Sequence, residues 1–178
     1  MMKAGSGEDD VVMRMGISAA WRALADRVVA EYRAALGGDL LAVACFGSVA
    51  RGQAGPESDL DLYVVTRGQV ADPLGQCWGG AIRLRETREY RALAREGHRP
   101  DPMPIFHTVA KLATHPWILL DIADHGVILY DPAGILAWEL EAVRRRLREL
   151  GSKRVMRPDG SWYWDLKPDW RPGETIEL

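Results

Sequence analysis

The sequence predicts an α/β (α+β) fold: a mixed central β-sheet flanked by helices, with a C-terminal β-hairpin extension. Segments whose apolar residues recur at helical spacing alternate with short apolar runs of strand length. The 178 residues are 47% hydrophobic and 27% charged, which is ordinary for a globular protein and enough for one core with a small appendage. We expect a flexible leader at 1–16, a main domain at 17–150 and a tail at 151–178, packed on the domain or on a partner.

The main domain opens with a helix and two strands. Apolar spacing predicts a helix over residues 18–36, which Ser18 caps and Gly37-Gly38 ends. The apolar run Leu40–Phe46 predicts a buried strand. The next strand, Asp59–Thr66, alternates its two aspartates with leucines, so both carboxylates are expected on one face.

The rest of the chain continues the alternation of helix and strand. Residues 69–96 are expected to be mainly helical, with a bend or break at Pro73 or at Gly79-Gly80. The later expected elements are a loop at 97–104, a strand at 105–109, a helix at 116–124, a strand at 127–130, a helix from Asp131-Pro132 to about Leu150, a hairpin of 153–157 with 162–166, and a last short strand at 174–177.

Charge and cysteine content narrow the class of protein. The formal net charge of −2 gives no basic field of the kind that favours nucleic acid as a partner. The two cysteines imply no disulfide and lack the paired spacing of a zinc site. The leader lacks the apolar segment of a signal peptide, and no apolar run is long enough to span a membrane. We therefore expect a cytoplasmic protein that is not bound to a membrane.

The segment from Cys45 to Val65 carries the chemistry. A buried strand ends in Gly47-Ser48, where a small residue lets the backbone approach a ligand and backbone N–H groups suit a phosphate. Ten residues later, Asp59 and Asp61 follow on one strand face, about 7 Å apart by strand rise. Two like charges on one face are costly unless a cation lies between them, and Mg²⁺ takes carboxylates together with phosphate oxygens. The pattern indicates metal-assisted phosphoryl transfer.

These residues carry a resemblance to a known family. Gly47-Ser48, the ten-residue gap and Asp59-Leu60-Asp61-Leu62 resemble the signature of the DNA polymerase β-like nucleotidyltransferase superfamily. Within it the chain is most similar to the small prokaryotic MNT-type branch, related to kanamycin nucleotidyltransferase, which also matches Arg51-Gly52 and Ser58. The resemblance extends over about residues 36–130 and implies a nucleotidyltransferase-like fold.

The resemblance also implies roles for the matching residues. Gly47 and Ser48 would bind the triphosphate of a nucleotide, with Arg51 and Ser58 beside them, and Asp59 and Asp61 would be catalytic and hold Mg²⁺ or Mn²⁺. For Arg51, a structural role in bracing the loop is an equal alternative. The enzyme would transfer a nucleoside monophosphate from a nucleoside triphosphate, with ATP the expected donor, and release pyrophosphate. Related antitoxins act beside a helical HEPN-type protein, which is thus a candidate partner.

One family feature is missing where it is expected. Many relatives carry a third carboxylate on a later strand, but residues 105–109 contain no acid. Asp101, just upstream, is the candidate third catalytic acid, and His107 is either a base or a packed histidine. A catalytically inactive module that binds a nucleotide or a partner is therefore the alternative function, and a purely structural domain ranks last.

Two other groups of residues admit more than one interpretation. Asp121, Asp124 and His125 lie at helical spacing, as in a metal site, but a solvated face with a histidine at the helix C-terminus is favoured. The tail aromatics Trp162, Tyr163 and Trp164 are suited to base stacking, but packing or contact within a homo-oligomer is favoured.

Overall fold

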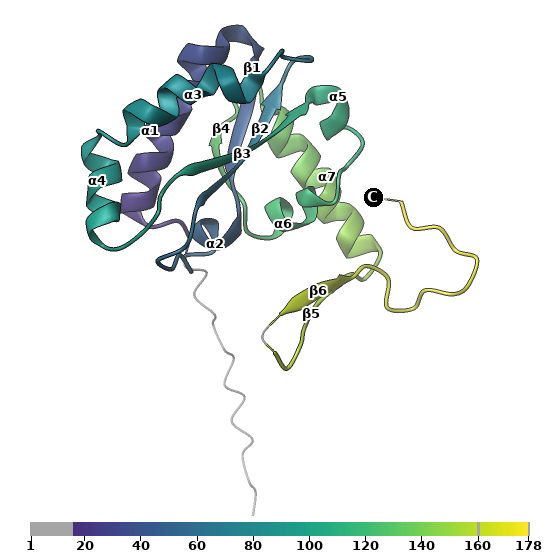
Figure 1. Ribbon diagram of the computed structural model, residues 1–178. Helices are drawn as coiled ribbons and strands as arrows, with labels where there is room; N and C mark the ends of the chain where they lie inside the picture. The colour runs from purple at the N-terminus through teal and green to yellow at the C-terminus, as the bar shows by residue number, and fades with distance from the viewer. Residues whose placement is uncertain (1–15, 160, 178) are drawn as a thin grey trace, which may run out of the picture.

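The computed structural model describes residues 16–159 and 161–177, and its centre is a mixed four-stranded sheet of order β3-β2-β1-β4 (Figure 1). β1 (Leu40–Cys45) pairs antiparallel with β2 (Leu60–Thr66) and with β4 (Val127–Tyr130). β3 (Pro102–Thr108) runs parallel to β2 and forms an edge of the sheet. The predicted leader, residues 1–16, lies outside the described residues except for Gly16.

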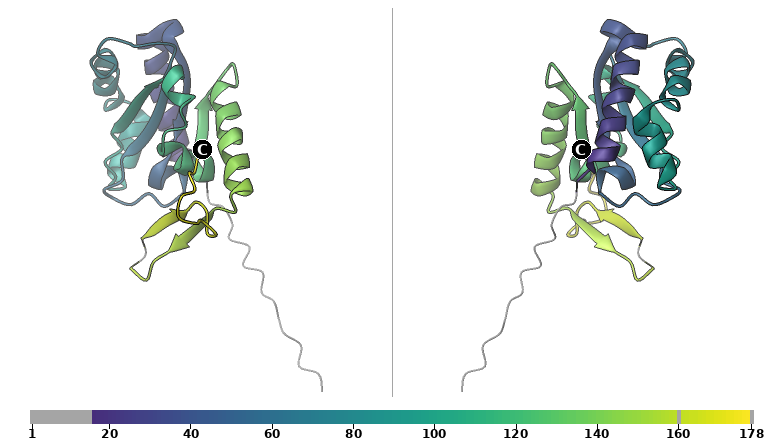
Figure 2. Two further views of the ribbon diagram at one scale, coloured as in Figure 1. Left: turned by 90° about the vertical axis from the view of Figure 1, so that its right-hand side faces the viewer. Right: turned by 90° about the vertical axis from the view of Figure 1, so that its left-hand side faces the viewer.

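Helices cover both faces of this sheet (Figure 2). The first face is covered by α1 (Ala19–Leu36), α3 (Pro73–Leu84) and α4 (Arg88–Arg95). The second face is covered by α5 (Val109–Leu112), α6 (Ile118–His125) and α7 (Ile135–Glu149). The single turn α2 (Gly47–Ala50) closes the end of β1, and the 3₁₀ turn η1 (Gly37–Asp39) precedes that strand. The predicted fold class is confirmed.

The alternation of side chains along β1 and β2 produces two cores, one on each face. In β2, Leu60, Leu62 and Val64 enter the core under α1, whereas Tyr63 and Val65 enter the core under α7. Because neighbouring side chains of a strand point to opposite faces, Asp61 belongs to the α7 face. The strand pattern therefore fixes on which side of the sheet the acidic pair lies.

The predicted helix at 69–96 is two helices, and its break is not at the glycines. α3 begins at Pro73, where the Asp72 carboxylate accepts a hydrogen bond from the Gly75 amide at 3.0 Å. It continues through Gly79-Gly80, because a side chain at Gly80 would collide with Glu31 of α1 and glycine permits the close approach. The chain breaks at residues 85–87, and Thr87 caps α4 through the Tyr90 amide.

The third strand of the sheet begins earlier than its sequence predicts. Pro102 and Pro104 belong to β3, although a loop was expected up to Pro104. The Leu60 amide donates to the Asp101 carbonyl at 3.0 Å, so odd-numbered residues of β3 bond to β2. The proline nitrogens consequently face the open edge of the sheet, where no N–H donor is required.

Two further expectations near the C-terminus are wrong. α7 begins at Ile135 rather than at Asp131-Pro132, but the Asp131 carboxylate still caps it by accepting from the Ala137 amide at 2.8 Å. No strand forms at 174–177, because the Glu174 carbonyl accepts from the Trp170 indole N–H and the Glu177 carbonyl from Arg146. Side chains thus satisfy backbone groups that a strand would have paired.

The tail forms the predicted hairpin, β5 (Lys153–Met156) with β6 (Trp162–Asp165), and lies at one end of the main sheet (Figure 1). Trp164 and Leu166 pack against the α7 core, so the hairpin is attached to the domain. Cys45 and Cys77 are buried free thiols. Among the helices that the structure describes, none is long and apolar enough to cross a membrane.

Candidate functional site

The site begins at the turn between β1 and α2, where Gly47 has a left-handed backbone with φ of 72°. The Phe46 amide donates to the Asp61 carbonyl at 3.1 Å, which joins the ends of the two strands. A Cβ atom at position 47 would overlap a carboxylate oxygen of Asp61. Glycine is therefore required twice, once by the backbone conformation and once because the carboxylate lies directly against the turn.

The two predicted ligand serines lie together beside this turn. The Ser48 hydroxyl donates to the Ser58 hydroxyl at 2.9 Å, and the Gly55 amide donates to the same Ser58 oxygen at 2.9 Å. The Gln53 amide donates to the Ser48 carbonyl at 2.9 Å. These bonds fold the loop between α2 and β2 back onto the turn and hold both hydroxyls next to the first residues of β2.

Asp59 and Asp61 lie at the start of β2, and both are partly buried. Burial raises the pKa of the Asp61 carboxyl, the negative charge of Asp59 raises it further, and the positive charge of Arg51 lowers it. The charge of Asp59 thus acts on the Asp61 carboxyl, in keeping with two acidic groups that lie close together at this end of β2. Burial and the Asp61 charge also raise the pKa of the Cys45 thiol to about 12, so this cysteine is protonated at neutral pH and is no nucleophile.

Arg51 follows α2, and its positive charge acts on the Asp61 carboxyl. Its Nε donates to the Gln53 side-chain oxygen at 3.2 Å, which is the loop-bracing contact that the sequence offered as one alternative. Its charge lowers the pKa of Asp61 and also that of Asp121 on α6. Arg51 therefore lies within electrostatic reach of Asp61 on β2 and of Asp121 on α6.

Asp101 does not join the acidic pair. Its carboxylate accepts hydrogen bonds from Arg85 Nε at 3.2 Å and from the Tyr90 hydroxyl at 3.1 Å, on the side of α3 and α4. The β3 residue opposite Asp61 is Met103, which is 52% exposed. Within residues 16–159 and 161–177, no three His, Cys, Asp or Glu side chains are grouped closely enough to hold a metal ion. The expectation that Asp101 completes a three-acid site is thus not met.

His107 is a packed residue. Its Nδ1 lies 3.2 Å from the Tyr63 hydroxyl, and the two rings meet edge to face at 5.4 Å. It lies opposite Val65, about 13 Å along β2 from Asp61 by strand rise. Burial, assisted by the charge of Lys111, lowers the pKa of His107 and keeps the ring neutral. The packed alternative of the two proposed from sequence is confirmed.

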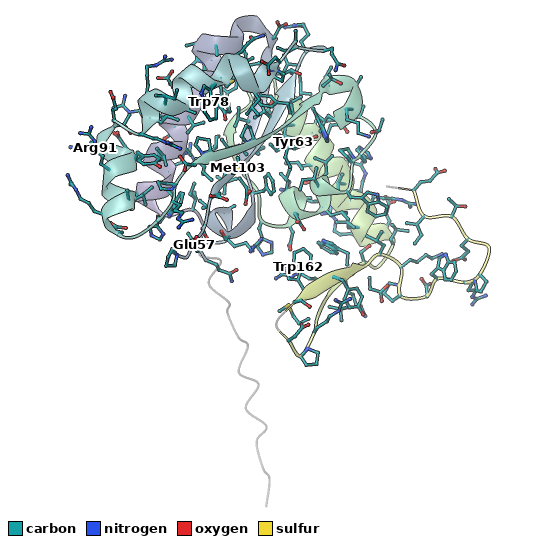
Figure 3. The ribbon with its side chains drawn as sticks, viewed as in Figure 1. Glu57, Tyr63, Trp78, Arg91, Met103 and Trp162 are labelled. Carbon is teal, nitrogen blue, oxygen red and sulfur yellow. The ribbon has the colours of Figure 1, made fainter. Side chains whose placement is uncertain are left out.

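The residues at the end of α6 are connected to the hairpin. Arg154 Nη1 of β5 lies 3.3 Å from Asp124 Oδ2 and 3.3 Å from His125 Nε2, and His125 Nδ1 lies 2.7 Å from the same carboxylate. The Arg154 guanidinium also covers the Trp162 ring at 4.5 Å, and Trp162 lies on the hairpin below α6 in Figure 3. Sequence reasoning missed Arg154, because nothing local marks a basic strand residue as the partner of a helix more than 25 residues earlier.

The chain is similar to several solved structures. One is a toxin–antitoxin structure with AMP-PNP, at 15% identity and a TM-score of 0.43, covering 71% of this chain and 92% of that one. Another contains a tri-AMPylated Shewanella oneidensis HEPN toxin in complex with MNT antitoxin, at 13% identity and a TM-score of 0.41, covering 74% and 92%. A third, an MntA–HepT toxin–antitoxin, has 14% identity and a TM-score of 0.39, covering 72% and 92%. None of the curated proteins matches the chain.

The family is assigned from a match to the sequence profile of the nucleotidyltransferase domain. This profile matches residues 27–132, more than half of the chain, and so includes β1, the Gly47-Ser48 turn, the acidic strand β2, β3 and α6. The matched range begins within α1 and ends just after β4, so it contains all four strands of the main sheet. The chain belongs to the nucleotidyltransferase domain family.

Proposed function

We propose that this chain transfers a nucleoside monophosphate from a nucleoside triphosphate, with ATP as the donor, to an acceptor that it binds beside α2 and β2. The observation that carries the proposal is the position of the Asp61 carboxylate, which lies against the Gly47 turn and next to Asp59. Phosphate-binding backbone groups and paired carboxylates thereby share one corner of the sheet, as nucleotidyl transfer requires.

The donor set fits a divalent cation. Asp59 and Asp61 are partly buried like charges, and burial raises the pKa of Asp61, so the ionised pair is unstable without a positive partner. Carboxylate oxygens are the ligands that Mg²⁺ and Mn²⁺ prefer. When bound, such an ion would neutralise charge on the triphosphate and polarise the α-phosphate.

The other residues of the corner are assigned to the nucleotide. The amides that open α2 at Gly47 and Ser48 would bind the β- and γ-phosphates, and the Ser48 and Ser58 hydroxyls add donors. Arg51 would neutralise phosphate charge while its Nε stays on Gln53. In the reaction, an acceptor oxygen forms a bond to the α-phosphorus, the bond from that phosphorus to the β-phosphate oxygen breaks, and pyrophosphate leaves.

The test is transfer of label from α-labelled ATP in the presence of Mg²⁺ or Mn²⁺. Asp59→Asn and Asp61→Asn should each lower transfer about 100-fold or more, because each removes a charge worth several kcal/mol to the metal site. Asp101→Asn is the matched control and should retain transfer, because its carboxylate is bonded to Arg85 and Tyr90 instead. Transfer that survives both of the first two substitutions would remove this site from consideration.

A second candidate function is a binding module that holds a nucleotide or a partner without turnover. The specific observation in its favour is Met103, because the β3 residue opposite Asp61 carries no carboxylate. Calorimetry with ATP and Mg²⁺ separates the two functions. Binding that Asp61→Asn abolishes, without any transfer of label or release of pyrophosphate, would favour the module.

The partner is proposed from the sequence resemblance alone. A small helical HEPN-type protein would serve as the acceptor of the nucleotidyl group or as a bound partner in the cytoplasm. Co-expression with the product of a neighbouring gene, followed by mass spectrometry of that product, tests this. An added mass of one nucleoside monophosphate is expected, and its loss in Asp59→Asn assigns the addition to this site.

A further inference from the structure

Among the described residues, the corner formed by α2 and β2 offers no unassigned group that can remove a proton from an acceptor. Asp59 and Asp61 are assigned to the metal, Asp101 is bonded to Arg85 and Tyr90, and β3 offers Met103. A hydroxyl is a poor nucleophile until its proton is taken, and a positioned base typically contributes about 10²–10⁴-fold to such a reaction. A carboxylate from another element is therefore needed near α2.

Asp121 of α6 is that carboxylate by position. α6 packs against α2, and Asp121 lies on the face of α6 that also carries Asp124 and His125, three and four residues later. The charged and titratable groups that act on it are Arg51 after α2, Asp124 and His125 on α6 itself, and Arg154 on β5. The charge of Arg51 acts on Asp61 as well, and α6 covers the same face of the sheet to which Asp61 belongs.

The charged side chains around Asp121 at the end of α6 make contacts with one another. Asp124, His125 and Arg154 contact one another at 2.7–3.3 Å, and Arg154 also lies over Trp162. Among the described residues, no hydrogen bond or ion pair involves the partly buried Asp121 carboxylate. The hairpin thus holds the end of α6 in place, and the Asp121 oxygens stay available to a substrate.

We propose that Asp121 is the general base of this site, and that the acceptor is a neutral hydroxyl rather than an ionised phosphate or carboxylate. This rests on the proposed function. The acceptor oxygen bonds to the α-phosphorus, its proton passes to the Asp121 carboxylate, and pyrophosphate leaves with the electrons of the broken P–O bond. An acceptor that is already ionised needs no base, and Asp121 would repel it.

The environment of Asp121 suits this role. Burial raises the pKa of its carboxyl, and the charge of Arg51 limits that rise, so the group is more basic than an exposed aspartate. Below its pKa the protonated group cannot accept a proton. The transfer rate should consequently rise with pH through one ionisation and then reach a plateau.

The experiment uses the full chain with α-labelled ATP and Mg²⁺, and its acceptors are water, glycerol at molar concentration and inorganic phosphate. Single-turnover rates of AMP, glyceryl-AMP and ADP formation are measured across pH for wild type, Asp121→Asn, Asp121→Glu and Asp124→Asn. Asp121→Asn should lower the first two rates about 10²–10⁴-fold, remove the acidic limb of the pH profile and leave Mg²⁺–ATP binding within about twofold. Asp121→Glu should restore part of the transfer rate, together with the acidic limb of the pH profile.

The controls separate the failure of each proposal. Asp124→Asn changes a neighbouring carboxylate on the same helix face and should alter the rate less than tenfold, with the pH limb intact. If Asp121→Asn keeps the wild-type rate and limb while Asp59→Asn abolishes the reaction, the assignment of the base is wrong and the proposed function stands. If ADP forms faster than AMP and glyceryl-AMP, the hydroxyl assignment is wrong. If wild type forms no product that depends on Asp59, both proposals fail.

Discussion

Gly47 and Asp61 illustrate how two residues fourteen positions apart constrain each other. The positive φ of Gly47 turns the chain from β1 into α2, and the absence of a side chain there leaves room for the Asp61 carboxylate. The Phe46 amide and the Asp61 carbonyl bond the two strands at the same point. The acidic group is thus held directly against the turn that opens α2.

Gly47→Ala should therefore damage both the fold and the site. A Cβ in the left-handed region costs about 1–2 kcal/mol, and here it also displaces the Asp61 carboxylate. We expect a lower melting temperature and loss of Mg²⁺-dependent ATP binding, measured by thermal unfolding and calorimetry. Gly38→Ala is the control, because open space surrounds that position. Normal ATP binding by Gly47→Ala would contradict the contact.

Asp61 should make the metal-free protein sensitive to pH. Because burial raises the pKa of Asp61, the folded protein holds its proton over a pH range in which the unfolded chain has lost it. Stability then falls as pH rises from the unfolded pKa through the folded pKa. In EDTA, Asp61→Asn should melt higher than wild type above that range and equally below it, and Mg²⁺ should stabilise wild type alone. Melting curves that coincide at every pH in EDTA would refute this.

At the scale of elements, the helix and strand boundaries depend on contacts and hydrogen bonds with other parts of the chain. β3 admits two prolines because their nitrogens face the open edge, and α3 passes through two glycines because α1 packs close there. The break between α3 and α4 is made by Thr87, whose hydroxyl donates to the Leu84 carbonyl at 2.6 Å and accepts from the Tyr90 amide at 3.2 Å.

Thr87→Ala should cost about 1 kcal/mol, the usual worth of an N-cap hydroxyl. α4 also supplies Tyr90, which holds Asp101, so fraying of this helix should loosen the Tyr90 and Asp101 pair without touching the acidic pair on β2. Chemical denaturation measures the loss, and Thr87→Ser should recover most of it because serine keeps the hydroxyl. A loss of stability equal in both variants would mean that the cap is not the cause.

The whole molecule is one sheet shared by two cores. Leu24 of α1 and Leu140 of α7 are both fully buried, but they lie on opposite faces of the sheet. β1 and β2 contribute side chains to both cores, so neither core can form while the other is absent. The hairpin adds Trp164 and Leu166 to the α7 core and holds α6 through Arg154.

Leu24→Ala and Leu140→Ala should each cost about 2–5 kcal/mol, the range for buried leucines, and should lower one common transition. Unfolding followed by far-ultraviolet circular dichroism and by tryptophan fluorescence should coincide in both variants. Conservative Leu24→Met and Leu140→Met substitutions should cost less. Two separate transitions in either alanine variant would show that the faces unfold independently.

Local signals account for what could be predicted from sequence. The sheet, the Gly47-Ser48 turn and the shared face of Asp59 and Asp61 follow from apolar patterning and strand alternation, which act over a few residues. Prediction was poorer at the start of β3 and of α7, and at residues 174–177. There, hydrogen bonds to residues distant in the chain decided the backbone conformation instead of local sequence pattern, as with Arg146 and the Glu177 carbonyl.

By itself, the sequence determined the fold class, the corner at which β1 meets β2, and the acids that line it. Only the tertiary structure decided which further groups meet that corner. Asp101 is near in sequence but is held by Arg85 and Tyr90, whereas Asp121 is sixty residues after Asp61 and shares with it the electrostatic influence of Arg51. The physical reason is that spacing fixes the face of one element, while packing between elements fixes which faces meet.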